Sequence, residues 1–218
     1  MRLGIFGGTF DPIHLGHLRL AEEVGEELGL ERVYLIPAAV PPHKEGRPIA
    51  SFQDRLAMVT LATEESPMLE PLDLEGRRQG LSYSIETLKE LHRLFAPDPD
   101  LYFILGMDAF YEIETWHEYA KLFDYAHFVV IPRPGAPSEQ LDTFLANLVV
   151  PFTKQEENHL FSGPSGKELI FKQAILMDIS STDIRKRVAS GKSIRFLVPR
   201  EVRYYIREEG LYRTHGIP

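Results

Sequence analysis

Two histidines lie in a glycine- and proline-rich segment near the start of the chain, MRLGIFGGTFDPIHLGHLRLAEEVGEEL. A short apolar run gives way to Gly7 and Gly8, and His14 and His17 then follow on either side of Gly16. Backbone N–H groups beside glycines can approach an anion closely, and a following helix offers free N–H donors and the positive end of its dipole. Histidines three residues apart on a helix can point the same way, and Gly16 leaves space for a bulky phosphate chain. The segment therefore predicts a phosphate site.

Two other interpretations of this segment stay open on the residues alone. A glycine–proline turn that carries two surface histidines fits the pattern about equally well. A metal site formed by His14 and His17 is weaker, because a pair of histidines without a further carboxylate or histidine nearby is short of the usual ligand number.

A second segment with polar groups follows far downstream, Ile179-Ser-Ser-Thr-Asp-Ile-Arg185. An expected strand leads into three hydroxyls at the start of a helix, where Ser180 and Asp183 have the spacing of a capping box. Hydroxyls, free N–H groups and the guanidinium of Arg185 would together form a second anion site. On its own the segment is more typical of a plain capped helix, so its meaning depends on the first segment.

These residues need elements to position them, and the apolar pattern predicts alternating strands and helices. Strands are expected at residues 3–6, 32–36, 101–105, 127–131 and 175–179, and helices at 18–28, 51–64, 84–95, around 109, and at 199–208. Gly29 is placed to end the first helix, Ser51 and Asp54 form a capping box at the start of the second, and Pro199 falls in the first turn of the last, with Gly210 beyond its end.

Strands that are apolar throughout and alternate with helices indicate an α/β fold with a doubly wound parallel sheet. Such sheets bind ligands at the carboxyl ends of their strands, where both polar segments fall. Residues 134–172 show no clear pattern and are interpreted as an insertion or a crossover. A single domain over residues 1–218 is expected, with a helical part from about residue 180.

The composition narrows the classes of function. With 218 residues, 44% of them hydrophobic and 26% charged, the chain is typical of a globular protein. A net charge of −8 argues against nucleic acid or an anionic membrane as a partner, although a local basic cleft for phosphate is compatible with it. The lack of cysteine excludes disulfides, zinc–thiolate sites and thiol nucleophiles. No membrane span or signal peptide is expected, so a cytoplasmic protein is the default.

The two polar segments together resemble the signature motifs of the nucleotidyltransferase superfamily of adenylyl- and cytidylyltransferases, which has a Rossmann-like (HUP-type) fold. Within it, features between the motifs resemble the bacterial nicotinate-nucleotide adenylyltransferase family. These features are Pro41-Pro-His-Lys44, Ser82-Tyr-Ser84, Gly106-Met-Asp108, Thr115-Trp-His117 and Arg133-Pro-Gly135. The resemblance runs from residue 3 to about 212 and leaves only 136–172 without a matching motif.

The resemblance implies a reaction in which the 5′-phosphate of nicotinate mononucleotide attacks the α-phosphorus of ATP, releasing pyrophosphate and giving deamido-NAD. No protein nucleophile is needed, so catalysis rests on positioning and charge stabilisation. Mg²⁺ is expected on the triphosphate, held by phosphate oxygens and water and not by a protein metal site. The oligomeric state stays open, with a homo-oligomer possible.

The resemblance also implies roles for individual residues. His14, His17 and Arg185 are expected to be catalytic. Residues expected to bind ATP are Gly7, Gly8, Thr9, Phe10, Gly16, Gly106, Asp108, Ser181, Thr182 and Arg185. Those expected to bind nicotinate mononucleotide are His43, Lys44, Ser84, Trp116, His117 and Arg133. Position 84 more usually carries threonine in the family, and serine keeps the hydroxyl.

Alternatives remain for some of these residues and for the function. Trp116 could be a core tryptophan, and Asp108 could be a simple N-cap. Another superfamily member, such as a phosphopantetheine adenylyltransferase or a cytidylyltransferase, is the nearest rival function. A non-catalytic nucleotide-binding sensor on the same fold is the rival of a different class.

Overall fold

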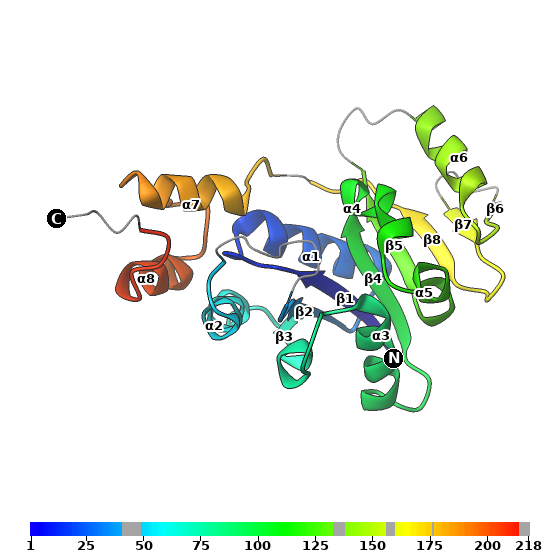
Figure 1. Cartoon of the computed structure of the whole chain (residues 1–218), viewed down its shortest axis with the longest axis horizontal. Coiled ribbons are helices and arrows are strands. Elements are labelled where there is room, and N and C mark those ends of the chain that lie inside the picture. The colour runs from blue at the N-terminus through cyan, green and yellow to red at the C-terminus, as the bar shows by residue number, and fades with distance from the viewer. Residues whose placement is uncertain (41–48, 133–137, 156–159, 176, 214–218) are drawn as a thin grey trace.

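An eight-stranded sheet runs through the part of the chain that the computed structural model describes, residues 1–40, 49–132, 138–155, 160–175 and 177–213. The strands are β1 (Arg2–Gly8), β2 (Arg32–Pro37), β3 (Leu69–Pro71), β4 (Asp100–Gly106), β5 (His127–Ile131), β6 (Thr153–Lys154), β7 (Leu160–Ser162) and β8 (Glu168–Phe171). They lie in the order β3-β2-β1-β4-β5-β8-β7-β6 (Figure 1).

The doubly wound parallel sheet predicted from the sequence is confirmed for six of these strands, β3 to β8 across the sheet. The chain moves outward from β1 through β2 to β3, then returns to β4 on the other side of β1 and continues to β5. The strand order therefore reverses between β1 and β4, and a crevice opens there beyond the carboxyl ends of the strands.

The structure corrects the interpretation of residues 134–172 as a plain insertion or crossover. This region holds α6 (Ser138–Asn147) and the strands β6, β7 and β8, which extend the sheet beyond β5. β6 and β7 are antiparallel to their neighbours, so the sheet is mostly but not wholly parallel. Strands of two to four residues are too short to show an apolar period in the sequence, which is why the pattern missed them.

Helices cover both faces of the sheet (Figure 1). The helices besides α6 are α1 (Leu15–Leu28), α2 (Phe52–Thr63), α3 (Ser84–Leu94), α4 (Met107–Tyr111), α5 (Tyr119–Tyr125), α7 (Ser181–Ala189) and α8 (Arg200–Glu208), with single 3₁₀ turns at Leu74–Arg77 and Ile113–Thr115. One core contains Val24, Met58 and Ile184 from α1, α2 and α7, and the other contains Leu88 and Phe110 from α3 and α4.

Three predictions about elements near the site differ from the structure. The first helix begins at Leu15 and not at residue 18, because His14 is its N-cap. Among the described residues of 175–179 there is no strand: the Ile175 N–H donates to the Glu23 carboxylate at 3.0 Å, and the Ile179 N–H closes a tight turn at 2.7 Å. Pro199 is the N-cap of α8 and does not lie in its first turn.

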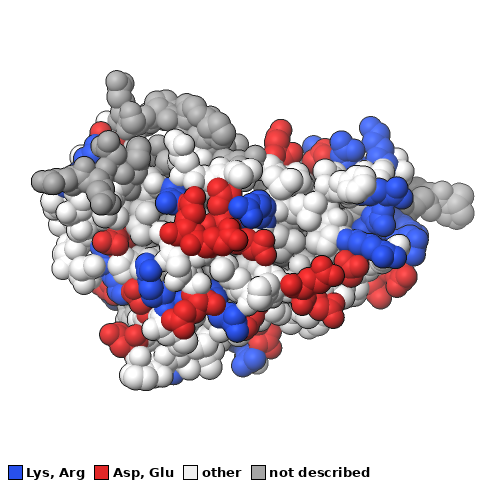
Figure 2. Space-filling view, turned by 180° about the vertical axis from the view of Figure 1, so that it is seen from behind, with Lys and Arg blue, Asp and Glu red and all other residues white. Residues whose placement is uncertain are grey.

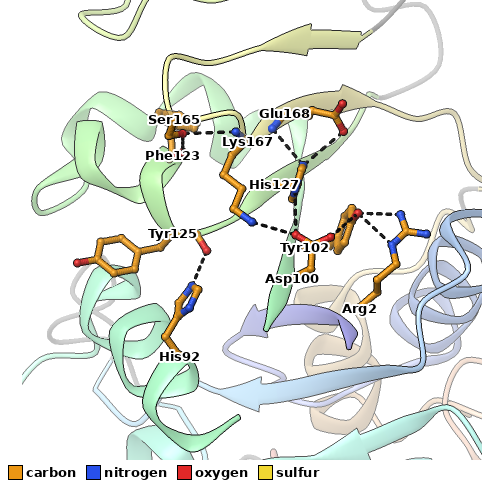
Figure 3. Close-up of polar contacts among 10 residues, drawn as sticks. All are labelled: Arg2, His92, Asp100, Tyr102, Phe123, Tyr125, His127, Ser165, Lys167 and Glu168. Atoms are coloured by element: carbon orange, nitrogen blue, oxygen red, sulfur yellow. Dashed lines mark hydrogen bonds and ion pairs between the residues drawn. The ribbon is translucent and has the colours of Figure 1, made fainter. Parts of the chain in front are cut away.

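A polar cluster fastens β8 to the rest of the sheet at the end opposite the β1–β4 crevice (Figure 3). His127, the first residue of β5, is 8% exposed, and its Nε2 lies 3.1 Å from a carboxylate oxygen of Asp100. Its Nδ1 accepts the Glu168 N–H at 3.1 Å, and Lys167 and Tyr102 donate to the same Asp100 carboxylate. Burial lowers the pKa of His127, so the ring is neutral at pH 7 and bridges the two strands as donor and acceptor.

Candidate active site

Glycines end both strands at the point where the strand order reverses. Gly7 and Gly8 close β1, and Gly106 closes β4 and caps α4. Added Cβ atoms at Gly7 and Gly106 would meet open space or ordinary contact, but one at Gly8 would lie 3.0 Å from the Phe10 ring. Phe10 has a left-handed φ of 48° and is 3% exposed, so the turn after β1 folds the ring back onto the core and leaves the backbone at the crevice.

His14 and His17 form a reciprocal capping box at the start of α1. Each Nδ1 accepts the backbone N–H of the other residue at 3.3 Å, and the rings stack with centroids 3.6 Å apart. Two occupied Nδ1 acceptors assign the proton of each neutral ring to Nε2, the atom directed away from the cap. Burial lowers the pKa of His14 to about 4, so this histidine is a neutral donor at pH 7.

The surroundings of the histidine pair fix the two rings. The Phe10 ring packs edge-on against His17, with centroids 5.1 Å apart. A Cβ at Gly16 would lie 3.1 Å from the His14 Nδ1. The sequence predicted that Gly16 leaves space for phosphate, whereas the structure places the His14 ring against it, so any larger residue there would displace that ring.

The structure brings the second polar segment beside the first. The Ser181 hydroxyl donates to the Pro12 carbonyl at 2.8 Å, and Arg185 Nη1 donates to the Asp11 carbonyl at 2.6 Å. Arg185 Nη2 also donates to the Thr182 hydroxyl at 3.3 Å. Two segments separated by about 170 residues thus form one surface on which two histidines, two hydroxyls and a guanidinium lie around the start of α1.

The predicted capping boxes are half formed. Ser180 caps α7 by accepting the Asp183 N–H at 3.1 Å, but the Asp183 carboxylate pairs with Arg187 at 2.8 Å. Ser51 caps α2 in the same way, and its hydroxyl donates to the Asp54 carboxylate.

Sequence reasoning missed the buried charges beneath this surface. Asp11 is 2% exposed and Arg55 is 1% exposed. Arg55 donates to the Thr9 carbonyl at 2.8 Å and to carbonyls of Ala39 and Ala50, so it holds the turn after β1 from below. Arg55 lies on the buried side of α2 with Met58 and Val59, and a cation at the helical spacing of two apolar residues is a signal that could have identified it.

A cavity of about 320 Å³ opens beside this surface, between the ends of β1 and β4 and the starts of α3 and α4. Of the predicted residues, Gly7, Gly8, Thr9, Ser84, Gly106, Trp116 and His117 line it. Trp116 is half-buried: its ring packs edge-on to Phe103 against the core and also lines the cavity, so the structure fits a core tryptophan and a ligand-binding one equally. The His117 ring lies tilted against the Tyr83 ring, with centroids 4.4 Å apart, and Ser84, the first residue of α3, lines the cavity at a helix start that no side chain caps.

The remaining predicted residues are placed as follows. Asp108 is exposed in the first turn of α4, where Gly106 is the N-cap, so the alternative of Asp108 as a simple cap is wrong. His43, Lys44 and Arg133 lie outside the described residues.

Basic side chains gather at the end of the molecule that carries α7 and α8 (Figure 2). Residues 181–213 contain Arg185, Lys186, Arg187, Lys192, Arg195, Arg200, Arg203, Arg207 and Arg213, against four acids, Asp183, Glu201, Glu208 and Glu209. On a chain of net charge −8, this gives the second polar segment a positive setting, which favours an anionic ligand.

The described ranges hold neither a cluster of metal ligands nor a membrane-spanning helix. In them, no three histidine, aspartate or glutamate side chains come together as metal ligands. Likewise, none of the helices in that part of the chain has the length and apolar content to cross a bilayer.

The chain is similar to known proteins over nearly its whole length. Residues 5–187 match the family described as cytidylyltransferase-like. The chain is 48% identical to a probable nicotinate-nucleotide adenylyltransferase of Desulfatibacillum aliphaticivorans, over 97% of this chain and 100% of that one. It is 46% identical to a protein of the same name from Syntrophotalea carbinolica, over 98% of each. The structure superposes on Plasmodium falciparum nicotinic acid mononucleotide adenylyltransferase complexed with NaAD with a TM-score of 0.71, 20% identity and 97% of each chain covered, a likeness of fold.

Proposed function

Because this chain belongs to the nicotinate-nucleotide adenylyltransferase family, we propose that it transfers the adenylyl group of ATP to nicotinate mononucleotide, giving deamido-NAD and pyrophosphate. The observation that carries the proposal is the junction of the two polar segments through Ser181 and Arg185, at the edge of a cavity lined by Trp116. One part offers several phosphate-binding groups and the other a flat aromatic surface, as a reaction between a triphosphate and a ring-bearing mononucleotide requires.

In the proposed reaction a phosphate oxygen of the mononucleotide forms a bond to the α-phosphorus of ATP, and the bond from that phosphorus to the oxygen bridging to the β-phosphorus breaks. Pyrophosphate leaves with that oxygen. The Nε2–H groups of His14 and His17 donate to phosphate oxygens as negative charge grows on them. Their fixed rings mean that little reorganisation is needed when the charge develops.

The start of α7 is assigned to bind the leaving pyrophosphate. The free N–H groups of this helix, the Thr182 hydroxyl and the outer side of the Arg185 guanidinium would bind the β- and γ-phosphates. Ser181 already donates its hydrogen to Pro12, so it would contribute as an acceptor or through its backbone.

The rest of ATP is assigned to the ends of β1 and β4. The backbone of Gly7 to Phe10 lines the nucleotide cleft. Phe10 is buried, so its side chain acts by supporting His17. Gly106 and Asp108, at the end of β4, would meet the adenine and ribose.

The mononucleotide is assigned to the cavity. Trp116 would stack on the pyridine ring, and the N–H groups around His117 and at the start of α3, with the Ser84 hydroxyl, would face the ring carboxylate. His43, Lys44 and Arg133, outside the described residues, are proposed for the mononucleotide phosphate on the family resemblance.

Use of ATP implies a divalent cation, and Mg²⁺ is the proposed ion. The described residues offer no set of three ligands, and Mg²⁺ keeps several waters when it binds phosphates, so the donors present fit an ion carried mainly by the triphosphate. We also propose that α7 and α8 belong to one catalytic domain with the sheet, which is supported by the Leu15 N–H bond to the Leu197 carbonyl at 3.0 Å.

The test is pyrophosphate release from ATP with Mg²⁺ and a panel of acceptors. Rapid release with nicotinate mononucleotide supports the proposal. Release with phosphopantetheine instead, or from CTP with another acceptor, would assign the chain to a different transferase of the superfamily. Tight ATP binding with no release for any acceptor would favour the nucleotide-binding sensor.

A further inference from the structure

A tyrosine more than twenty residues beyond the second polar segment reaches back beneath the triphosphate site. The Tyr212 hydroxyl donates to Asp11 Oδ1 at 2.7 Å. The same oxygen accepts the Ala50 N–H at 3.1 Å, so both of its contacts come from segments other than the one that carries Asp11. Burial, with Asp11 next, raises the pKa of Tyr212, which therefore stays a hydroxyl and a donor.

The other carboxylate oxygen of Asp11 is buried and has no hydrogen-bond partner among the described residues. It lies 3.5 Å from Arg185 Nη1, which donates instead to the backbone carbonyl of Asp11 at 2.6 Å. A buried carboxylate oxygen in this position is costly, and two parallel hydrogen bonds from the Arg185 guanidinium would satisfy it. The two bonds to Oδ1, from the Ala50 N–H and the Tyr212 hydroxyl, hold the carboxylate in its present orientation.

Two features indicate that the Tyr212 contact is built into the fold. The residue has a left-handed φ of 63°, a conformation that is uncommon for a residue other than glycine. Its hydroxyl nevertheless makes a short bond to a carboxylate that is 2% exposed. The backbone is therefore held in a strained conformation by the surrounding contacts, as is typical of positions that place a functional group.

We propose that Tyr212 is a positioning residue for the triphosphate site: by fixing the Asp11 carboxylate, it keeps the Arg185 guanidinium from turning inward and leaves it directed to the phosphates of ATP. The inference rests on the proposed function for the identity of the anion. Without the hydroxyl, the carboxylate rotates and accepts two hydrogen bonds from the guanidinium. The β- and γ-phosphates then lose their main cation.

The experiment compares Tyr212→Phe with Tyr205→Phe. Tyr205 makes the same kind of bond, hydroxyl to the Asp54 carboxylate at 2.9 Å, between α8 and α2 and away from Arg185. Binding of ATP and of inorganic tripolyphosphate is measured by calorimetry, with the melting temperature and the KM values for both substrates. Tyr212→Phe is expected to weaken both anions about tenfold and to raise the KM for ATP but not that for nicotinate mononucleotide, whereas Tyr205→Phe changes only stability.

Two further variants separate positioning from general destabilisation. Adding Asp11→Asn to Tyr212→Phe removes the charge that captures Arg185 and is expected to recover most of the tripolyphosphate affinity. Ala50→Pro removes the other donor to the same oxygen and should weaken the binding of both anions as much as Tyr212→Phe does. This variant therefore keeps the test open if Tyr212→Phe does not fold.

Equal anion affinity in Tyr212→Phe and Tyr205→Phe, or no recovery in the double variant, would overturn the inference. The binding measurements are independent of turnover. If the wild type releases no pyrophosphate with nicotinate mononucleotide, the proposed function fails while the positioning of Arg185 is still decided by the tripolyphosphate affinities.

Discussion

The hydroxyl of Ser181 donates a hydrogen bond to the backbone carbonyl of Pro12, with 2.8 Å between the two oxygens. This bond joins the start of α7 directly to the turn that precedes α1. Because both helix starts carry groups of the proposed site, their relative placement would decide whether the histidines and the guanidinium can meet the same triphosphate.

Ser181→Ala is expected to raise the KM for ATP several-fold and to lower the free energy of unfolding by about 1 kcal/mol, the typical net value of one hydrogen bond. The control is Ser190→Ala, which removes a serine-to-carbonyl bond of 2.8 Å at the other end of the same helix. Urea unfolding and steady-state kinetics measure both effects. A KM for ATP that changes equally in the two variants would mean that the Ser181 bond has no role in the site.

His17→Ala is expected to lower kcat by about two to three orders of magnitude, the range for loss of one transition-state donor. The stacked His14 ring also loses its support, so the fold is checked by the melting temperature. His92→Ala, on α3 with its ring bonded to the Tyr125 carbonyl, removes a histidine elsewhere and should leave kcat unchanged. Near-normal kcat in folded His17→Ala would remove this residue from the catalytic set.

Arg185→Lys keeps the charge but lacks the planar fork, which anchors on the Asp11 carbonyl and the Thr182 hydroxyl with separate nitrogens. An ammonium cannot hold both anchors and still face the phosphates, so the KM for ATP should rise at least about tenfold. The matched change, Arg187→Lys, alters an exposed ion pair with Asp183 and should leave the KM for ATP unchanged. If lysine supports normal ATP use at position 185, the fork geometry has no importance there.

Acid should destabilise the protein through His14. Burial lowers its pKa from the ordinary 6.5 of an unfolded chain to about 4, so between these pH values the unfolded chain binds a proton that the folded chain excludes. The stabilisation is therefore complete above pH 6.5 and is lost as the pH falls toward 4, by about 2 kcal/mol between pH 7 and pH 5.

The comparison is with His14→Asn, which keeps a capping oxygen but does not titrate. Urea unfolding at pH 7 and pH 5 should show that the free energy of unfolding falls more in the wild type than in His14→Asn. His127 titrates in both proteins and cancels from the difference. Equal losses would mean that the His14 ring accepts a proton without penalty.

Nicotinate mononucleotide should be used at least about tenfold better than its nicotinamide counterpart. In the proposed site, the uncapped N–H groups at the start of α3 would satisfy a carboxylate, whereas an amide would present its own NH₂ to one of them and leave a donor unpaired, at about 1–3 kcal/mol. Specificity constants for the two mononucleotides at saturating ATP provide the measurement. Equal use would discredit the assignment of the cavity around Trp116 to the carboxylate-bearing ring.

Features of the fold that depend on neighbouring residues in the chain were predictable from the sequence. β5 matches its predicted bounds, 127–131, because a continuous apolar run can only be buried, and Gly29 ends α1 in a left-handed conformation as expected. The two polar segments were recognisable because glycines, hydroxyls and histidines gathered at helix starts are typical of sites that bind phosphate.

What the sequence could not supply depends on contacts between distant residues. Nothing near Asp11 or Tyr212 in the sequence indicates that the two meet, since their bond spans 201 residues. The start of α1 was placed three residues late because the cap is a histidine, whereas serine, threonine, aspartate and asparagine are the usual signals. The half-formed capping boxes show the same limit, because Asp183 is drawn to Arg187 on the next turn.

The span of the Asp11–Tyr212 bond has a consequence for synthesis of the protein. Translation proceeds at roughly 5–20 residues per second, so the carboxylate of Asp11 is made about 10 to 40 seconds before the hydroxyl that fixes it. Over that interval β1 can pair with β2 and β4, but the Asp11 carboxylate has only the Ala50 N–H as a donor to Oδ1. The nascent chain should thus have a stable sheet and no ordered phosphate site, and ATP should protect it from proteolysis only after residue 212 has left the ribosome.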